Sequence, residues 1–425
     1  MASIQDLYGG SLRAAGIKHF TSRYGLDPSL INPALDRLSP SRPKPQLSES
    51  ILSWADTGYG RIPFFHESGM DSDLFHAVGC ILSGHLEKLS IEEKREIAMI
   101  PVADIYEKIL FDALSHDRIS ERIKEKPLWP NGKRFALFLS HDVDEVRKTY
   151  QYITRPLLSL KKGRIGRALE QAGSCYTDRK RKKDPYWTFD ELMNIEESLG
   201  VRSTSYFLQE DEKTHISDPK SWKHYPRKYS FRDPKVSAVL RSMSQGGWDV
   251  GLHGSLYSYM SREKLAEQKR DLEKSLGSGV CGTRQHHLNL KIPDTWRFQE
   301  ATGLAYDTSL GYKDMNGFRW GTCFPFHPID PSTGMEQGIL ELPLAYMDTT
   351  HFSEQGKAWP KISALIDTVE RQGGLFTVLF HHSVFNDSEY PGWTDIYRKL
   401  VECCRKKNAW IATGKEINDW WRMRA

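Results

Sequence analysis

The chain has 425 residues, a formal net charge of +4, and 39% hydrophobic and 27% charged residues. So small a charge on so long a chain gives no reason to expect nucleic-acid binding, and no segment approaches the about 18 consecutive apolar residues of a transmembrane helix. The first residues lack the basic start and apolar core of a secretory signal peptide. We therefore expect a cytoplasmic protein without a transmembrane segment, for which peripheral contact with a membrane stays open.

Residues 1–130 are predicted to form a mainly helical accessory region. Residues 90–114 have the apolar spacing of one or two amphipathic helices, and residues 40–45 are a Pro-rich, basic connector. The region ends at a loop, residues 126–132, in which two prolines and a glycine interrupt helix and strand alike.

Residues 131–425 are predicted to form an α/β domain built on a parallel sheet. Short apolar runs alternate with helical patterns, and polar residues that include His, Asp, Arg or Glu follow each run. Continuous apolar runs are typical of strands buried on both faces. We therefore expect a (β/α) barrel whose functional side chains lie at the C-terminal ends of the strands. The runs are residues 135–139, 203–208, 249–252, 280–283 and 375–380.

A helix is predicted between two of these runs, at residues 260–276. Ser261 stands at its start, Leu265, Leu272 and Leu276 fall on one stripe, and Gly277 is placed to cap its end.

The residues after the first run could hold a metal. Asp142 and Asp144 lie two residues apart, so in an extended segment they share a face, and one could bind a metal while the other stays free as a base. His253 is a natural second ligand, and His286 or His287 could complete the set. A divalent metal lowers the pKa of a water that it binds, and a nearby carboxylate can then take the proton.

Two further residues complete a catalytic set. Arg284 is placed to hold a free carboxylate through a bidentate contact and to keep it ionised. His381, at the end of the last strong run, would protonate the leaving amine. Base, ligands, orienting arginine and acid together predict metal-assisted hydrolysis of an amide or ester.

Two basic stretches interrupt the domain, at residues 161–167 and 179–183. They could contact phosphate groups of a nucleotide sugar, a lipid carrier or an anionic membrane surface. The ordinary alternative is a solvated loop without a ligand.

The order of these motifs resembles the polysaccharide deacetylase superfamily (NodB homology, carbohydrate esterase family 4) over residues 131–425. The resemblance implies a distorted (β/α) barrel that removes acetyl or related acyl groups from sugars with a divalent metal. The family motif T-F-D-D-G appears as Ser140-His-Asp-Val-Asp144. Asp142 falls on the catalytic base, Val143 replaces the metal aspartate, and Asp144 is the substitute, as in a divergent H-D-V-D branch.

The family's second motif, H-[ST]-x-x-H, is matched only at His253, because Tyr257 stands where the second histidine belongs. The third motif, usually R-x-P-[YF], begins at Arg284 and contains a new histidine, so we expect His286 as the third metal ligand. His287, Tyr257 and His141 remain alternatives for that ligand.

The later motifs suggest further site residues. Asp307 is expected to hold Arg284 in place, and His381 falls on the catalytic histidine of the last motif, L-[LF]-H-[DP]. A segment without a counterpart in simple deacetylases, residues 317–321, contains Arg319 and Trp320. The side chains expected to contact substrate are His287, Arg319, Trp320 and Tyr257.

The resemblance therefore predicts a metal-dependent deacetylase, a hydrolase of non-peptide C–N bonds, acting on a sugar or sugar-derived intermediate in surface-glycan or secondary-metabolite biosynthesis. The expected substrate is a small molecule or a lipid- or nucleotide-linked glycan. Mixed Asp and His ligation suits zinc first, with cobalt, nickel, manganese and iron open. The alternatives are a non-catalytic carbohydrate-binding protein of the same fold and an amidohydrolase of a non-sugar C–N bond.

Overall fold

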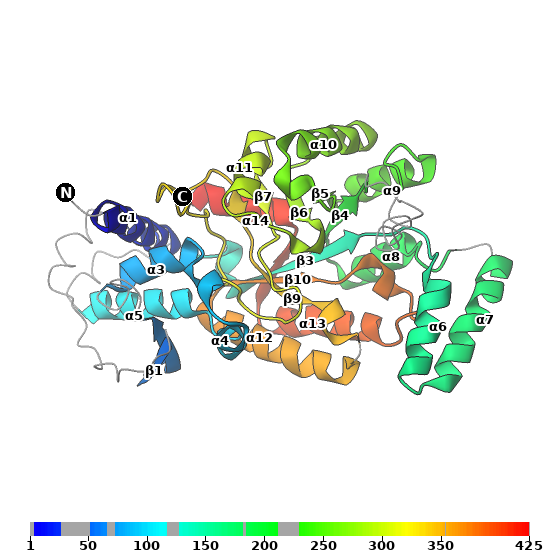
Figure 1. The fold of residues 1–425 in the computed structure, drawn as a ribbon, viewed down its shortest axis with the longest axis horizontal. Helices are drawn as coiled ribbons and strands as arrows, with labels where there is room; N and C mark the ends of the chain where they lie inside the picture. The colour runs from blue at the N-terminus through cyan, green and yellow to red at the C-terminus, as the bar shows by residue number, and fades with distance from the viewer. Residues whose placement is uncertain are drawn as a thin grey trace.

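The computed structural model describes residues 4–26, 52–65, 73–116, 127–181, 184–210, 229–352 and 354–424 (Figure 1). The Pro-rich connector at 40–45 and residues 182–183 of the second basic stretch lie outside these ranges. Within the described ranges, every helix is too short or too polar to cross a bilayer.

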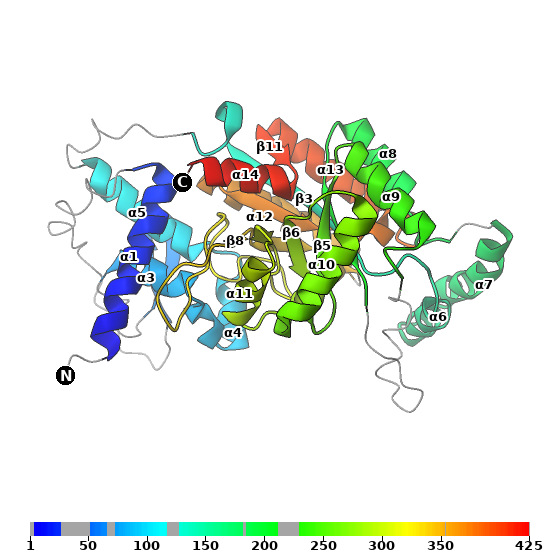
Figure 2. The same ribbon diagram turned by 90° about the horizontal axis from the view of Figure 1, so that it is seen from above.

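A parallel sheet forms the centre of the molecule (Figures 1 and 2). Within the described residues it has nine strands in the order β8-β7-β6-β5-β4-β3-β10-β9, with β11 paired to β3 off this path. Each apolar run from the sequence forms one of these strands, which confirms the expected parallel α/β architecture. The strands are β3 (Phe135–Val143), β4 (Thr204–Leu208), β5 (Asp249–Gly254), β6 (Gly282–Gln285), β7 (Tyr306–Asp307), β8 (Leu340–Glu341), β9 (Leu344–Met347), β10 (Leu375–Leu379) and β11 (Ala409–Ala412).

Helices follow the strands and cover the sheet from outside (Figure 2). Helix α10 forms where predicted: the Ser261 side chain accepts a hydrogen bond from the Lys264 amide, and Gly277 closes the helix at φ 86°. The helices are α6 (Gln151–Lys161), α7 (Ile165–Arg181), α8 (Phe189–Leu199), α9 (Pro234–Gln245), α10 (Arg262–Leu276), α11 (Asp294–Ala301), α12 (Ala358–Gln372), α13 (Trp393–Lys406) and α14 (Gly414–Arg424).

The register of the central strands brings the polar strand ends together. Every residue of β3 is buried, and Asp142 lies opposite Tyr206 of β4. On β5, His253 lies opposite Leu208 on one side and Arg284 of β6 on the other. Because the strands are parallel and in step, their C-terminal ends reach one edge of the sheet.

The N-terminal region lies at one end of the molecule, and the α6–α7 pair lies at the other (Figures 1 and 2). The predicted helices are present, but an antiparallel hairpin that the sequence analysis did not predict accompanies them. The elements are α1 (Ile4–Tyr24), β1 (Leu52–Thr57), β2 (Gly60–Phe65), α3 (Leu74–Leu82), α4 (Ile91–Ile97) and α5 (Val102–His116).

This region shares a hydrophobic core with the barrel. Phe75, Ile81 and Tyr106 belong to the same buried cluster as Trp296 and Trp320 of the C-terminal part. The region therefore packs against the sheet-bearing part of the chain through an apolar interface.

Candidate metal and catalytic site

Three side chains of ligand type converge at the C-terminal edge of the sheet. Asp144 follows β3, His253 lies on β5 and His286 follows β6, and one ligand atom from each lies within 4.8 Å of the others. Oδ1 of Asp144 is 3.2 Å from Nε2 of His253 and 3.7 Å from Nε2 of His286. A tetrahedral zinc with bonds of about 2.1 Å separates its ligand atoms by about 3.4 Å. The three residues therefore fit a divalent metal in chemistry and in spacing.

The Nδ1 atom of each of the two histidines faces an oxygen acceptor. Nδ1 of His253 donates to the carbonyl oxygen of Arg284 at 2.8 Å, since a carbonyl can only accept. This bond assigns the proton to Nδ1, so that Nε2 is the nitrogen that could bind a metal. Nδ1 of His286 lies 3.8 Å from Oε2 of Glu210, a buried carboxylate after β4. A carboxylate thus lies on the Nδ1 side of His286, where the supporting groups of metal-binding histidines lie, at a distance longer than a hydrogen bond.

Asp142 is held by Arg284. Nη1 of Arg284 donates to Oδ1 of Asp142 at 2.8 Å, and both side chains are buried. Burial opposes ionisation of Asp142, but Arg284, His253 and His381 outweigh it and lower the pKa of the carboxyl. Oδ2 of Asp142 lies 3.6 Å from Nε2 of His253, so an ionised carboxylate lies beside the three side chains of ligand type.

Arg284 is itself fixed by its surroundings. Its Nη2 donates to Oγ of Ser140 at 2.8 Å, and its Nε donates to the carbonyl oxygen of Thr308 at 3.1 Å. The guanidinium also lies 4.7 Å from the centre of the Tyr206 ring.

His381 and Asp348 form a second acid–base pair. The carboxylate of Asp348 accepts hydrogen bonds from Nδ1 of His381 at 2.7 Å and from its backbone N–H at 2.8 Å. Burial works against the imidazolium, but Asp348, followed by Asp144 and Asp142, raises the pKa of His381 to about 9. Nε2 lies 4.0 Å from Oδ2 of Asp144 and faces the ligand group.

A cavity of about 250 Å³ joins these groups. His287 and Leu288 line it and adopt φ values of 57° and 52°, which non-glycine residues rarely take. Lys313 and Thr349, which the sequence analysis did not single out, contribute polar groups to the wall. The cavity is lined by Asp142, Asp144, His253, His286, His287, Leu288, Lys313, Met347, Thr349, Leu379 and His381.

Asp307 was expected to hold Arg284 in place, but its carboxylate contacts other residues. Its Oδ1 accepts a hydrogen bond from Oγ of Ser309 at 2.7 Å, and its Oδ2 accepts one from Nε1 of Trp296 at 3.2 Å. Thr308, the next residue, makes the contact with Arg284. Side chains of an extended chain alternate between faces, so a shift of one residue exchanges the two roles.

Arg319 and Trp320 belong to the interface with the N-terminal region. Nε of Arg319 donates to Oε1 of Glu87 at 2.7 Å, and Nε1 of Trp320 donates to the same oxygen at 2.8 Å. Trp320 is fully buried, so the expectation that it contacts a substrate is wrong. The structure gives both residues a packing role.

The three alternative ligands, Tyr257, His141 and His287, do not belong to the group formed by Asp144, His253 and His286. Tyr257 is 46% exposed and does not line the cavity described above. Both ring nitrogens of His141 are engaged elsewhere, Nδ1 with the carbonyl oxygen of Phe380 at 2.7 Å and Nε2 with Oε1 of Glu196 at 3.0 Å. His287 stacks on His286 with ring centres 4.0 Å apart and reaches the cavity wall.

Comparisons with known proteins give likenesses of fold. No protein-family model and no curated protein matches the chain. A putative polysaccharide deacetylase from Mycobacterium smegmatis is 18% identical with a TM-score of 0.45, and the Puue allantoinase is 15% identical with a TM-score of 0.46; each match covers 70% of this chain and 93% of the other. A CE4 family pseudoenzyme from Bacillus anthracis is 10% identical with a TM-score of 0.33, covering 68% of this chain and 67% of the other.

Identities and TM-scores at this level assign neither activity nor substrate. The architecture rests on the sheet itself, in which every neighbouring pair is parallel and the end strands β8 and β9 have one partner each. The C-terminal part of the chain is a distorted (β/α) barrel of the kind that the motif resemblance implied.

Proposed function

We propose that the chain is a metal-dependent hydrolase that removes an N-acetyl or related acyl group from a sugar or a sugar-derived amine. One observation carries the proposal: a single cavity contains three metal-ligand side chains, a carboxylate kept ionised by arginine and a histidine kept protonated by aspartate. These are the groups that hydrolysis of an amide requires.

Asp144, His253 and His286 would hold the metal. A divalent cation held there would supply Lewis-acid activation of the attacking water and of the acyl carbonyl. Two imidazole nitrogens and one carboxylate oxygen suit zinc, and the same set accepts cobalt, nickel, manganese or iron.

Asp142 is the proposed base. Its lowered pKa keeps it ionised near neutral pH, so that it can take a proton from the attacking water. The hydroxyl oxygen then forms a bond to the acyl carbon. Arg284 keeps the carboxylate aimed at the cavity and stabilises its charged form before the transfer.

His381 is the proposed acid. Its Nδ1–H is bound to Asp348, which leaves Nε2–H facing the cavity. As the C–N bond breaks, Nε2 donates its proton to the departing nitrogen, which leaves as an amine while the acyl group leaves as a carboxylic acid. With a pKa of about 9, the imidazole is protonated at neutral pH and ready for this step.

The substrate enters a cavity with polar groups on its wall. Lys313 and His287 line this cavity and would bind hydroxyl groups of a sugar ring. The proposed substrate is a small molecule or a lipid- or nucleotide-linked glycan of surface-glycan or secondary-metabolite biosynthesis.

Two other functions remain to be tested against this one. A non-catalytic carbohydrate-binding protein has no use for both a base and an acid, so the pairs Asp142–Arg284 and His381–Asp348 favour an enzyme. An amidohydrolase of a non-sugar C–N bond would use the same groups, and product analysis separates it from a deacetylase.

Elemental analysis of the wild-type protein beside Asp144→Ala and His253→Ala tests the proposal. We expect about one equivalent of transition metal in the wild type and its loss in both variants, followed by release of acetate from acetylated sugars by the wild type. Failure of the wild type to take up zinc or cobalt would favour the binding-protein alternative.

A further inference from the structure

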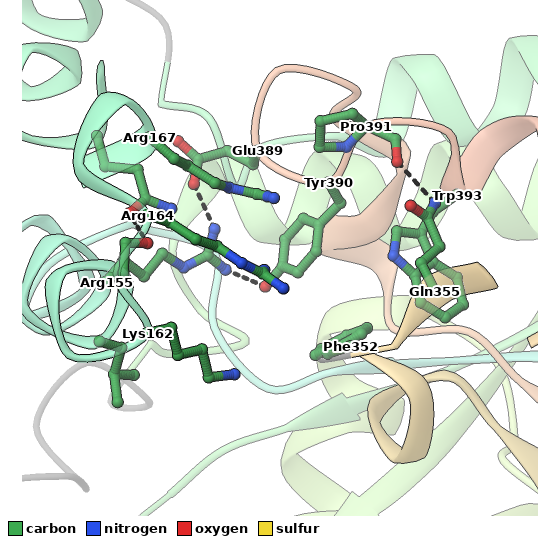
Figure 3. A pocket seen from close by; sticks show the side chains of 13 residues that line it. Arg155, Lys162, Arg164, Arg167, Phe352, Gln355, Glu389, Tyr390, Pro391 and Trp393 are labelled. Carbon is green, nitrogen blue, oxygen red and sulfur yellow. Dashed lines mark hydrogen bonds and ion pairs between the residues drawn. The ribbon is translucent and has the colours of Figure 1, made fainter. Parts of the chain in front are cut away.

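A second cavity lies between the α6–α7 pair and the segments that carry Phe352 and Tyr390 (Figure 3). Its volume is about 400 Å³. Arg155, Lys162, Arg164 and Arg167 come from α6, α7 and the turn between them, and Phe352, Gln355, Tyr390 and Trp393 form the opposite wall. The first basic stretch of the sequence thus faces a cavity.

The charges in this cavity do not balance. Glu389 is the one carboxylate among its described lining residues, and it is already paired with both Lys148 and Arg155. Lys162, Arg164 and Arg167 form no ion pair with the described carboxylates. Among the described lining residues, three positive charges therefore border a space whose one carboxylate is already paired, which favours binding of an anionic ligand.

Arg155 is fixed as part of the wall. It donates hydrogen bonds to Glu389 and to the hydroxyl of Tyr390, and its guanidinium lies 4.4 Å from the centre of the Tyr390 ring. Phe352 packs against Tyr390 with ring centres 5.1 Å apart and is 37% exposed. Tyr390 and Phe352 therefore form a packed aromatic surface opposite Lys162, Arg164 and Arg167.

A third cavity, of about 250 Å³, shares lining residues with both this cavity and the catalytic one. That space shares Arg155, Phe352 and Tyr390 with the basic cavity. It also shares Asp142, Asp144, Thr349 and His381 with the catalytic cavity. One elongated ligand can therefore lie across both.

We propose that the cavity under α6 and α7 binds a phosphoryl group of the substrate, so that the acylated sugar is carried on a phosphate or diphosphate ester. The inference rests on the proposed function for the role of the sugar end. Arginine suits the phosphoryl end, because its planar guanidinium donates two parallel hydrogen bonds to phosphate oxygens.

Binding of inorganic pyrophosphate, measured by calorimetry at low salt, tests the site without any need for turnover. We expect Arg164→Ala and Arg167→Ala each to weaken binding by about tenfold or more. Lys161→Ala is the matched control, since Lys161 is an exposed cation at the end of α6, close in sequence to the two arginines, and does not line the cavity. Undetectable binding by the wild type, or equal binding by the Arg164/Arg167 double variant, overturns the proposal.

Kinetics separate this proposal from the proposed function. With N-acetylglucosamine 1-phosphate, the double variant should raise KM at least tenfold with kcat unchanged, while its KM for N-acetylglucosamine stays at the wild-type value. An equal change in KM for both sugars overturns the phosphoryl site even if hydrolysis is intact. If the metal-loaded wild type hydrolyses neither sugar, the proposed function fails while the pyrophosphate result still decides the site.

The carrier of the phosphate is distinguished by two probes. Displacement of pyrophosphate by uridine diphosphate supports a nucleotide carrier. Cosedimentation with phosphatidylcholine vesicles that contain polyprenyl phosphate, lost in the Leu157→Ser/Leu169→Ser variant, supports a lipid carrier. The α6–α7 pair exposes apolar side chains that could meet such vesicles, with exposed fractions from 50% to 73%: Ile153, Leu157, Leu158, Leu160, Ile165, Leu169 and Tyr176.

Discussion

Asp348 accepts hydrogen bonds from both the backbone N–H and the Nδ1–H of His381. Two bonds to one residue fix the position of the imidazole and the direction of its ring. The negative charge of Asp348 is also the largest influence that raises the pKa of His381 against the effect of burial. Position and protonation of the proposed acid therefore depend on the same carboxylate.

Asp348→Asn should shift the alkaline limb of the pH–rate profile to lower pH. The acid must be protonated, so activity falls as pH rises through the pKa of His381, and loss of the carboxylate lowers that pKa from about 9. The profile of kcat against pH measures this shift. Asp395→Asn, at an exposed position of α13, is the control, and an unmoved alkaline limb in Asp348→Asn would contradict the assignment.

Asp142→Asn should keep the metal and lose turnover by a factor of about 100 or more, the usual contribution of a general base. The isosteric amide still meets Arg284 but cannot take a proton. Metal content and kcat are measured on the same preparation. Loss of metal from this variant would show that Asp142 and Asp144 exchange roles.

His286→Ala should lower metal affinity by about tenfold or more, while His287→Ala should leave it unchanged. The two side chains are adjacent and stacked, but Nε2 of His286 is the one that meets Oδ1 of Asp144. Competition with a zinc chelator measures both affinities. The reverse result would make His287 the third ligand.

The buried carboxyl groups Glu341 and Asp307 should make stability fall as pH rises. Trp296 donates to both, and burial, followed by the charge of Asp307, raises the pKa of Glu341 well above 4.5. A raised pKa means that the contribution is complete below pH 4.5 and is lost as pH climbs through the folded-state value.

In the wild type, Tm should fall between about pH 5 and about pH 8. Glu341→Gln should make this fall smaller, even if the substitution lowers Tm at both pH values. Glu402→Gln, on an exposed face of α13, should keep the wild-type slope. Equal slopes in all three proteins would show that Glu341 ionises normally.

Gly79→Ala should destabilise the N-terminal region by about 1–3 kcal/mol, as overpacking of a tight contact does. A Cβ at Gly79 would lie 1.9 Å from the carbonyl oxygen of Leu12, so α1 and α3 would have to separate. Gly173→Ala is the control, because a Cβ there meets nothing within 4 Å. Thermal unfolding compares the two, and equal Tm values would contradict the close contact.

Much of the fold follows from the sequence because the strands are buried on both faces. The run at 135–139 is apolar throughout, and the structure buries all of β3. Parallel strands also bring their ends to one edge, which is why Asp142, Asp144, His253 and His381 meet across more than two hundred residues of chain.

The parts that escaped prediction depend on partners distant in sequence or on a shift of one residue. The partner of Arg319 and Trp320 is Glu87, which no local pattern relates to them. Asp348 follows the short apolar strand β9, as the other site residues follow their strands, so the same pattern could have predicted it. The β1–β2 hairpin is too short for its alternation to stand out.

Strand β3 is hydrogen-bonded along both edges. One edge pairs with β10, and the other pairs first with β11 over residues 135–138 and then with β4 over residues 140–143. Amide protons of β3 can exchange with solvent only when neighbouring strands detach, so they should be among the slowest to exchange in the chain. Asp142 lies on β3 and Asp144 directly follows it, so both carboxylates are attached to the strand expected to detach last. The geometry of the site should therefore persist under conditions that already detach the strands at the ends of the sheet.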